Sequence, residues 1–148
     1  MKRDVEPRGG GASADLRARL DAAYAGDPFS RSLEFRVLDL RPGEALLAAE
    51  IEGVKLNAHG TGHGGALWTL ADMAFGAAAF HRGHLMTVGS DLTFLRPAPA
   101  GATVHAHARE VGATASSATY HVVLALDPHD PATVVASGSF SGRRPPRG

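Results

Sequence analysis

The chain has 148 residues with 15 basic and 15 acidic side chains, and 44% of its residues are hydrophobic, which fits one domain with a real hydrophobic core. The charges balance and the basic residues gather toward the two ends, which argues against nucleic acid as a partner because phosphate binding needs a basic patch. Cysteine is absent, which excludes disulfides, thiolate metal sites and cysteine nucleophiles and favours a cytoplasmic location.

Membrane association is not expected from the sequence. No apolar run approaches the roughly 20 residues that cross a bilayer. The first thirteen residues, MKRDVEPRGGGAS, lack the apolar segment of a signal peptide. We therefore expect a soluble cytoplasmic protein.

The N-terminal part is predicted to hold a tail, a helix and a β-hairpin. Residues 1–12 are charged and glycine-rich, which is typical of a disordered tail. Ser13 can cap a helix that ends near Gly26 and is broken by Asp27-Pro28. Apolar residues then alternate on either side of a turn at residues 41–44, which predicts a hairpin that ends near residue 51.

Residues 57–72, NAHGTGHGGALWTLAD, carry the strongest chemical signal. A glycine-rich loop runs into Gly64 and Gly65, where a buried helix over about residues 64–80 is predicted to begin. The first N–H groups of a helix are unpaired and lie at the positive end of its dipole, so they can bind a developing oxyanion. Two turns on, Asp72 is a lone carboxylate among apolar neighbours, which is costly to bury unless it has a use. An oxyanion site and a carboxylate on one helix suggest acyl chemistry.

Four strand-like segments follow this helix, which Gly83 ends. They cover residues 86–96, 103–110, 116–126 and 133–141, with turn residues between them. A solvated tail is expected at residues 143–148, so residues 13–142 form a single domain. One long helix wrapped by antiparallel strands is an α+β architecture. Because one helix leaves much apolar strand surface uncovered, we expect an oligomer formed through sheet edges.

Three other motifs are weaker. The glycines of residues 60–65 match G-x-G-x-x-G, but no parallel strand ends at the first glycine and no acid follows about 20 residues later. The histidine pairs His59/His63 and His105/His107 match no zinc-binding spacing, so neither a metal nor a cofactor is expected. No serine lies in the G-x-S-x-G motif of a hydrolase triad.

Helical spacing brings Gly65, Trp68, Thr69, Asp72 and Phe75 to one face of the central helix. Taken alone, Asp72 is equally well explained as a buried carboxylate that a backbone group or an arginine satisfies. Its neighbours favour a binding face, because the glycines let a ligand approach the backbone closely.

A specific combination of motifs runs through most of the chain: Asn57, His63-Gly64-Gly65, Thr69, Asp72, Thr87 and Phe94-Leu95-Arg96-Pro97-Ala98. This combination resembles the hotdog-fold acyl-CoA thioesterases, and most of all their PaaI-type branch, associated with phenylacetate degradation. The likeness extends from about Asp27 to Phe140. It implies a long helix wrapped by an antiparallel sheet, dimers that join their sheets and often pair into tetramers, and active sites between subunits.

The resemblance also implies the catalytic roles. The Gly64 N–H polarises the thioester carbonyl, and Asp72 of the facing subunit activates water or attacks directly. Asn57 and His63 hold the loop and the thioester end, and Thr87 helps to place the water.

The substrate-binding set implied in the same way consists of Gly65, Trp68, Thr69, Phe75 and Arg96. Arg96 and nearby basic residues are where such proteins meet the CoA phosphates, and the two aromatic side chains suit an aryl-acetyl or medium-chain acyl group. The sequence thus predicts an acyl-CoA thioesterase that needs no metal or cofactor, since hydrolysis requires only an oxyanion stabiliser and a base. The alternatives are a hotdog dehydratase for hydroxyacyl thioesters, which would want a catalytic histidine, and a non-catalytic acyl-CoA-binding protein.

Overall fold

The computed structural model of the chain describes residues 10–147. Along the chain the helices and strands are α1 (Gly10–Ala25), α2 (Pro28–Ser32), β1 (Arg36–Arg41), β2 (Glu44–Glu50), α3 (Gly64–Ala79), β3 (Met86–Phe94), β4 (Thr103–Ala113), β5 (Ser117–Ala125) and β6 (Val134–Arg143). Short 3-10 turns lie at Gly53–Lys55, Phe80–Arg82 and Pro131–Thr133. No helix within residues 10–147 is long and apolar enough to cross a membrane.

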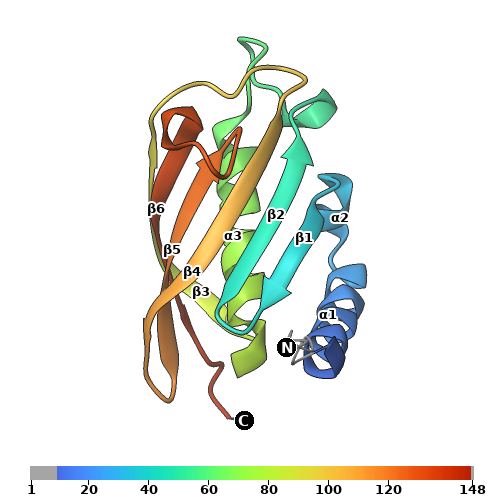
Figure 1. Cartoon of the computed structure of the whole chain (residues 1–148), viewed down its shortest axis with the longest axis vertical. Helices are drawn as coiled ribbons and strands as arrows, with labels where there is room; N and C mark the ends of the chain where they lie inside the picture. Colours follow the sequence, from blue (N-terminus) through green and yellow to red (C-terminus); the bar gives the residue numbers. More distant parts are fainter. Residues whose placement is uncertain (1–9, 148) are drawn as a thin grey trace, which may run out of the picture.

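The strands form one antiparallel sheet in the order β1-β2-β4-β5-β6-β3. Helix α3 lies along one face of this sheet, while α1 and α2 stand beside the β1 edge (Figure 1). The predicted α+β architecture, a long central helix wrapped by an antiparallel sheet, is confirmed.

The core lies between α3 and the inner face of the sheet. Strand residues alternate, so that Val104, Ala106 and Ala108 of β4 are fully buried, whereas the histidines between them face outward. Phe75 of α3 packs edge-on against Tyr120, with ring centroids 5.3 Å apart. Many of the buried residues of α3 are alanines, and their small side chains let the helix approach the sheet closely.

The ends of α3 follow from local sequence. His63 caps its first turn, because the ring Nδ1 accepts a hydrogen bond from the Gly65 N–H at 2.9 Å. At the other end a 3-10 turn leads to Gly83, whose φ of 89° suits glycine.

The N-terminal segment differs from the prediction in two ways. Helix α1 begins at Gly10 rather than Ser13, so residues 10–12 of the tail predicted for residues 1–12 are helical, and its residues 1–9 lie outside the described residues. A second short helix, α2, follows where only a break was expected. Asp27 caps it by accepting hydrogen bonds from the Ser30 backbone and hydroxyl, and Pro28 supplies the first helical residue.

Strand β3 is an open edge of the sheet. It pairs only with β6 among the described strands, and it is exposed along almost its whole length. Its apolar side chains Val88 and Phe94 are 59% and 50% exposed. An exposed apolar edge of this kind is a surface for pairing with another strand.

Candidate active site

Asp72 of α3 and Thr87 of β3 are in direct contact. The Thr87 hydroxyl, at the start of β3, donates a hydrogen bond of 2.6 Å to Asp72 Oδ1. Burial raises the pKa of Asp72 above its usual value, and the hydrogen bond from Thr87 opposes that rise. The structure therefore brings together the predicted base and the residue predicted to place the water.

A cavity of about 330 Å³ opens beside this pair. Its apolar wall includes Phe80 and Met86, and its polar groups include Tyr24 and Asp27 as well as Asp72. Tyr24 belongs to α1, and its hydroxyl donates to the Met73 carbonyl at 2.9 Å. The pKa of Tyr24 is raised by burial first, and then by the negative charges of Asp72 and Asp27.

Asn57 organises the glycine-rich loop from within. Its Oδ1 accepts hydrogen bonds from the backbone N–H groups of His59 and Thr61, at 2.9 and 3.1 Å. Its Nδ2 donates to the Thr61 hydroxyl at 2.9 Å. All of these contacts lie inside the loop, so in one chain Asn57 shapes the approach to α3.

The first turn of α3 has a backbone N–H group, that of Gly64, that is available to a ligand. The Gly65 N–H is taken by the His63 ring, whereas the Gly64 N–H donates to no acceptor within residues 10–147. A side chain on Gly64 would stand 3.5 Å from the ring of Phe94, at the end of β3. The free Gly64 N–H thus lies at the positive end of the helix dipole, as an oxyanion site requires.

Three of the predicted substrate-binding residues, Gly65, Trp68 and Thr69, lie on a second cavity. They line an apolar groove of about 590 Å³ together with His63, Phe29 and Val54. Trp68 is held by a hydrogen bond of 3.0 Å from its ring N–H to the Ser90 hydroxyl. The Thr69 hydroxyl bonds back to the Gly65 carbonyl at 2.8 Å. This groove has no residue in common with the cavity beside Asp72.

Phe75 and Arg96 occupy positions that sequence spacing did not indicate. Phe75 is only 1% exposed. It packs edge-on against Tyr120 and stacks on Phe140, so it is chiefly a core residue, although it also lines the cavity. Arg96 donates to the Ala132 carbonyl, which fastens the end of β3 to the turn before β6.

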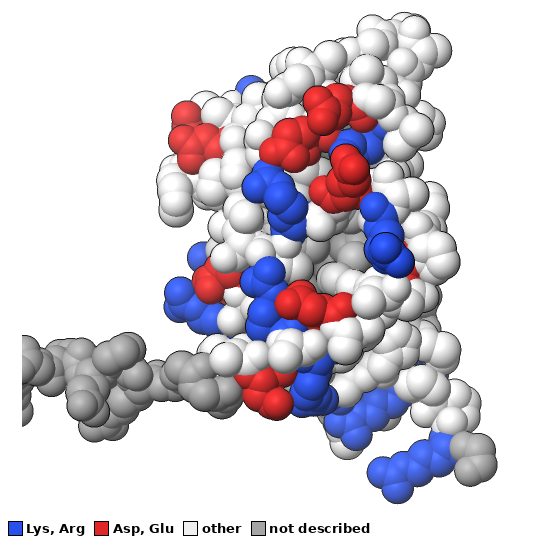
Figure 2. Space-filling view, turned by 90° about the vertical axis from the view of Figure 1, so that its right-hand side faces the viewer, with Lys and Arg blue, Asp and Glu red and all other residues white. Residues whose placement is uncertain are grey.

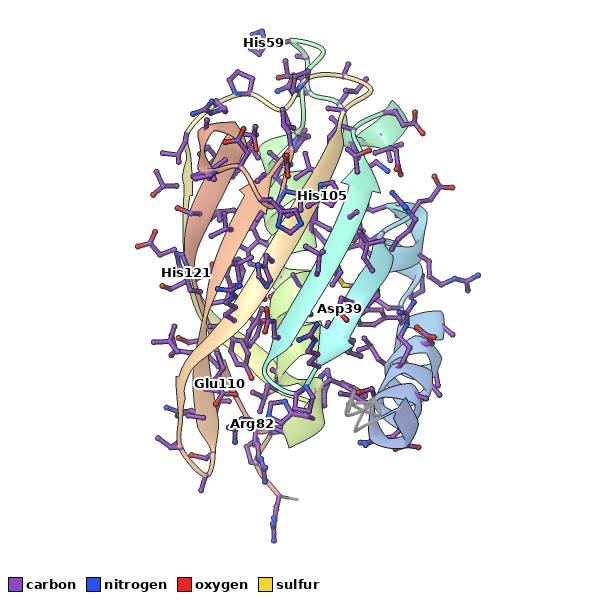
Figure 3. The ribbon with its side chains drawn as sticks, in the orientation of Figure 1. Asp39, His59, Arg82, His105, Glu110 and His121 are labelled. Carbon is purple, nitrogen blue, oxygen red and sulfur yellow. The ribbon has the colours of Figure 1, made fainter. Side chains whose placement is uncertain are left out.

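The histidines do not gather into a metal site. Within residues 10–147 no three His, Asp or Glu side chains are placed to hold a metal ion. In Figure 3, His59 stands at the tip of its loop, and His105 and His121 lie on the sheet face turned away from α3. His107 instead bonds to Glu44 at 2.6 Å.

Tyr24 and Asp27 line the cavity beside Asp72, and sequence analysis did not identify them. Both come from the N-terminal segment, far in sequence from Asp72. The local signal there is the Asp27-Pro28 pair, which predicts a helix break, whereas in the structure Asp27 caps α2.

Comparisons with known proteins bear on the family and the fold. Residues 59–131 match the family described as the Thioesterase superfamily. A putative esterase of Archaeoglobus fulgidus is 32% identical over 101 residues, which make up 68% of this chain and 66% of that protein. The chain therefore spans about two thirds of the length of that curated relative.

Two further similar proteins bear the name PaaI. The acyl-coenzyme A thioesterase PaaI of Escherichia coli is 37% identical over 90 residues, 60% of this chain and 64% of that protein. A solved structure of a variant of the phenylacetic acid degradation protein PaaI from Thermus thermophilus is 39% identical, with a TM-score of 0.73. The similarity covers 80% of this chain and 100% of that one.

The chain belongs to the thioesterase superfamily and has its hotdog fold. The predicted fold, and membership of a superfamily of thioester-hydrolysing enzymes, are therefore confirmed. Within the superfamily, its PaaI relatives confirm the resemblance to that branch.

Proposed function

We propose that the protein is an acyl-CoA thioesterase in which Asp72 activates water and the Gly64 N–H stabilises the oxyanion. The observation that carries this proposal is the Asp72–Thr87 hydrogen bond beside a cavity, combined with a free Gly64 N–H at the start of the same helix. The name of the Escherichia coli relative, acyl-coenzyme A thioesterase, supports the same substrate class.

The two catalytic groups must come from different subunits. Eight residues separate Gly64 from Asp72 on one helix, and at 1.5 Å per residue they are about 12 Å apart. One thioester carbonyl cannot meet both groups at that separation. A complete site therefore needs a second copy of the chain.

The exposed strand β3 offers a way to supply it. Thr87, near its start, contacts Asp72, and Phe94, at its end, lies against Gly64. If two β3 edges pair antiparallel about Ser90, Thr87 of one chain faces residue 93 of the other. Asp72 of one subunit then approaches the Gly64 N–H of its partner, and the exposed apolar side chains of β3 become buried.

The proposed chemistry follows from these positions. Asp72 removes a proton from water as the oxygen attacks the thioester carbon, and the Thr87 hydroxyl holds the carboxylate in place. The carbonyl oxygen becomes negative and accepts the Gly64 N–H, a contribution of about 3–4 kcal/mol to barrier lowering in comparable sites. The C–S bond then breaks, CoA leaves as the thiol after taking a proton, and the acid is released. The raised pKa of Asp72 makes it a stronger base than an exposed aspartate.

The cavity beside Asp72 is the proposed acyl site. Phe80 and Met86 offer apolar contacts, and its volume of about 330 Å³ suits an aryl-acetyl or medium-chain acyl group. The phenylacetic acid degradation protein among the relatives favours the aryl-acetyl group. A cytoplasmic dimer or tetramer, working without a metal or cofactor, belongs to the same proposal.

The direct test is thiol release from a panel of CoA thioesters carrying phenylacetyl, hydroxyphenylacetyl, benzoyl and fatty acyl groups. The wild type should cleave at least one, and Asp72→Asn should lose roughly 10²–10⁴-fold in kcat. Tight acyl-CoA binding without cleavage would favour a non-catalytic binding protein. Hydration of an unsaturated acyl-CoA without thiol release would favour the dehydratase.

A further inference from the structure

Three arginines gather at the C-terminal end of the described chain. Arg143, Arg144 and Arg147 line an open groove of about 530 Å³. The other residues of this groove are Met86, Ala115, Ser116, Pro145 and Pro146. No acidic residue contributes to it. Figure 2 shows blue side chains at the lower right of the molecule, while a red group lies farther left along the same lower end.

These arginines differ from most of the other arginines that the structure describes. Within residues 10–147, neither Arg143, Arg144 nor Arg147 forms an ion pair with a carboxylate. By contrast, carboxylates pair with Arg17, Arg19, Arg36, Arg41, Arg82 and Arg109. The chain as a whole is neutral, so this groove is a local concentration of positive charge that no described acid neutralises.

The groove adjoins the candidate active site. In the sheet, Arg143 of β6 pairs with Met86 of β3, and Gly142 pairs with Thr87. Thr87 bonds to Asp72, and Met86 lines both this groove and the cavity beside Asp72. A ligand that reaches from the cavity past Met86 therefore enters a basic environment.

We propose that Arg143, Arg144 and Arg147 bind the phosphate groups of the CoA moiety. This inference rests on the proposed thioesterase function, because it assigns the anionic end of the same substrate. Guanidinium groups bind phosphates through paired, charge-assisted hydrogen bonds. In CoA the pantetheine arm separates the thioester from the phosphates, so a phosphate site belongs outside the reaction cavity, as this groove does. The Arg96 guanidinium, in contrast, already bonds to the Ala132 carbonyl.

The test compares a substrate that has phosphates with one that lacks them. The triple variant R143Q/R144Q/R147Q and the wild type are assayed with an acyl-CoA and with the N-acetylcysteamine thioester of the same acyl group. With the acyl-CoA, KM should rise at least tenfold while kcat stays near the wild-type value. With the truncated thioester, both constants should match the wild type. The KM of the wild type for acyl-CoA should also rise with salt, and this dependence should weaken in the variant.

Controls separate charge from structure. R143K/R144K/R147K keeps the charge and should recover most of the affinity. Arg31 lies on α2 beside a different cavity. Arg31→Gln should therefore leave kcat and KM unchanged for both thioesters. If the triple variant loses activity equally with both thioesters, or if its KM for acyl-CoA is unchanged, the assignment is overturned. If KM for acyl-CoA rises in Arg96→Gln but not in the triple variant, the phosphate site lies at Arg96 instead.

Binding of free CoA, measured by calorimetry, keeps the two proposals distinguishable. If the wild type hydrolyses no thioester, the thioesterase proposal fails. The arginine site then stands if the triple variant binds CoA at least tenfold more weakly than the wild type, and it falls if binding is equal or if the wild type binds no CoA. Dephospho-CoA in the same titration identifies whether the 3′-phosphate or the diphosphate is bound.

Discussion

At the scale of single residues, the environment of Asp72 combines two opposing influences. Burial favours the neutral acid, and the Thr87 hydroxyl favours the carboxylate. A carboxylate that accepts a hydrogen bond within a partly apolar cavity is held in one orientation while remaining more basic than it would be in water. Each influence can be removed separately by mutation.

Removing the Thr87 hydroxyl should shift the pH profile. Thr87→Val deletes the hydrogen bond that lowers the pKa of Asp72, so this pKa should rise further. Because the base must be deprotonated, the acid limb of kcat/KM should move to higher pH, and the loss should be larger at pH 6 than at pH 9. Thr87→Ser keeps the donor and should leave the limb in place. A Thr87→Val profile that coincides with the wild type would argue against this role.

Neutralising Asp72 should stabilise the protein at neutral pH. The pKa of Asp72 is raised in the folded state, so the folded protein holds this proton more tightly than the unfolded chain. Stability from this group is present below the unfolded pKa and is lost as the pH rises through the folded pKa. Asp72→Asn should therefore have a higher Tm than the wild type at pH 8, and the difference should shrink toward pH 4. A lower Tm at both pH values would contradict this sign.

At the scale of elements, strand β3 depends on the glycines of β6. Gly138 faces β3 so closely that a side chain there would come within 1.6 Å of the Asp91 carbonyl oxygen. Gly142 likewise leaves room for the Phe75 ring, which a side chain would meet at 2.6 Å. These contacts determine how closely β3, and with it Thr87, approaches α3.

Enlarging Gly138 should therefore damage both stability and activity. Gly138→Ala must push the β3 backbone away, at a cost of about 1–3 kcal/mol or more, and should lower Tm and kcat together. Gly112→Ala in β4 is the matched control, because nothing lies within 4 Å of its added side chain. Equal melting temperatures for the two variants would show that β3 adjusts freely.

A second feature at this scale is a group of hydrogen bonds just beyond the C-terminal end of α3. Arg82, just after the helix, makes two hydrogen bonds to Glu110 of β4, at 3.0 and 2.6 Å. Tyr120 donates to the same carboxylate at 2.8 Å. Figure 3 shows Arg82 and Glu110 together at the lower end of the sheet. The Arg82 hydrogen bonds are the main cause of a lowered pKa of Glu110. The contacts of Glu110 with Arg82 and Tyr120 should therefore weaken only when the solution becomes acidic.

At the scale of the whole molecule, the proposed site requires two subunits, and mixing variants tests this requirement. Asp72→Asn keeps an intact Gly64, and Gly64→Pro keeps an intact Asp72 but has no N–H at that position. Proline suits this first helical position, and the extended backbone of His63 accepts a following proline.

Each variant alone should be at least a hundredfold less active than the wild type. After co-refolding, half of the dimers should be mixed, and each mixed dimer should have one intact site, so about one quarter of the wild-type activity should return. Size-exclusion chromatography under the assay conditions verifies dimer formation. No recovery of activity from a verified mixture would contradict the proposal that each site combines Gly64 of one subunit with Asp72 of the other.

Much of this protein could be read from its sequence. The strands were predicted because alternation and turn residues report which face is buried, and α3 because an apolar run begins at Gly64 and ends before Gly83. The chemistry of residues 57–72 was also legible, since helix starts and buried carboxylates have the same meaning in any fold.

Only the tertiary structure decided which of these residues meet. In the structure Thr87 contacts Asp72, Phe75 lies in the core and Arg96 bonds to Ala132. The sequence did not predict these contacts because they depend on how β3 packs beside β6 and α3. The tertiary structure also brought Tyr24, Asp27 and the C-terminal arginines to the neighbourhood of Asp72. The periodicity of a segment indicates which of its faces is buried but not which other segments pack against it. Contacts between residues so distant along the chain therefore cannot be predicted from local sequence patterns.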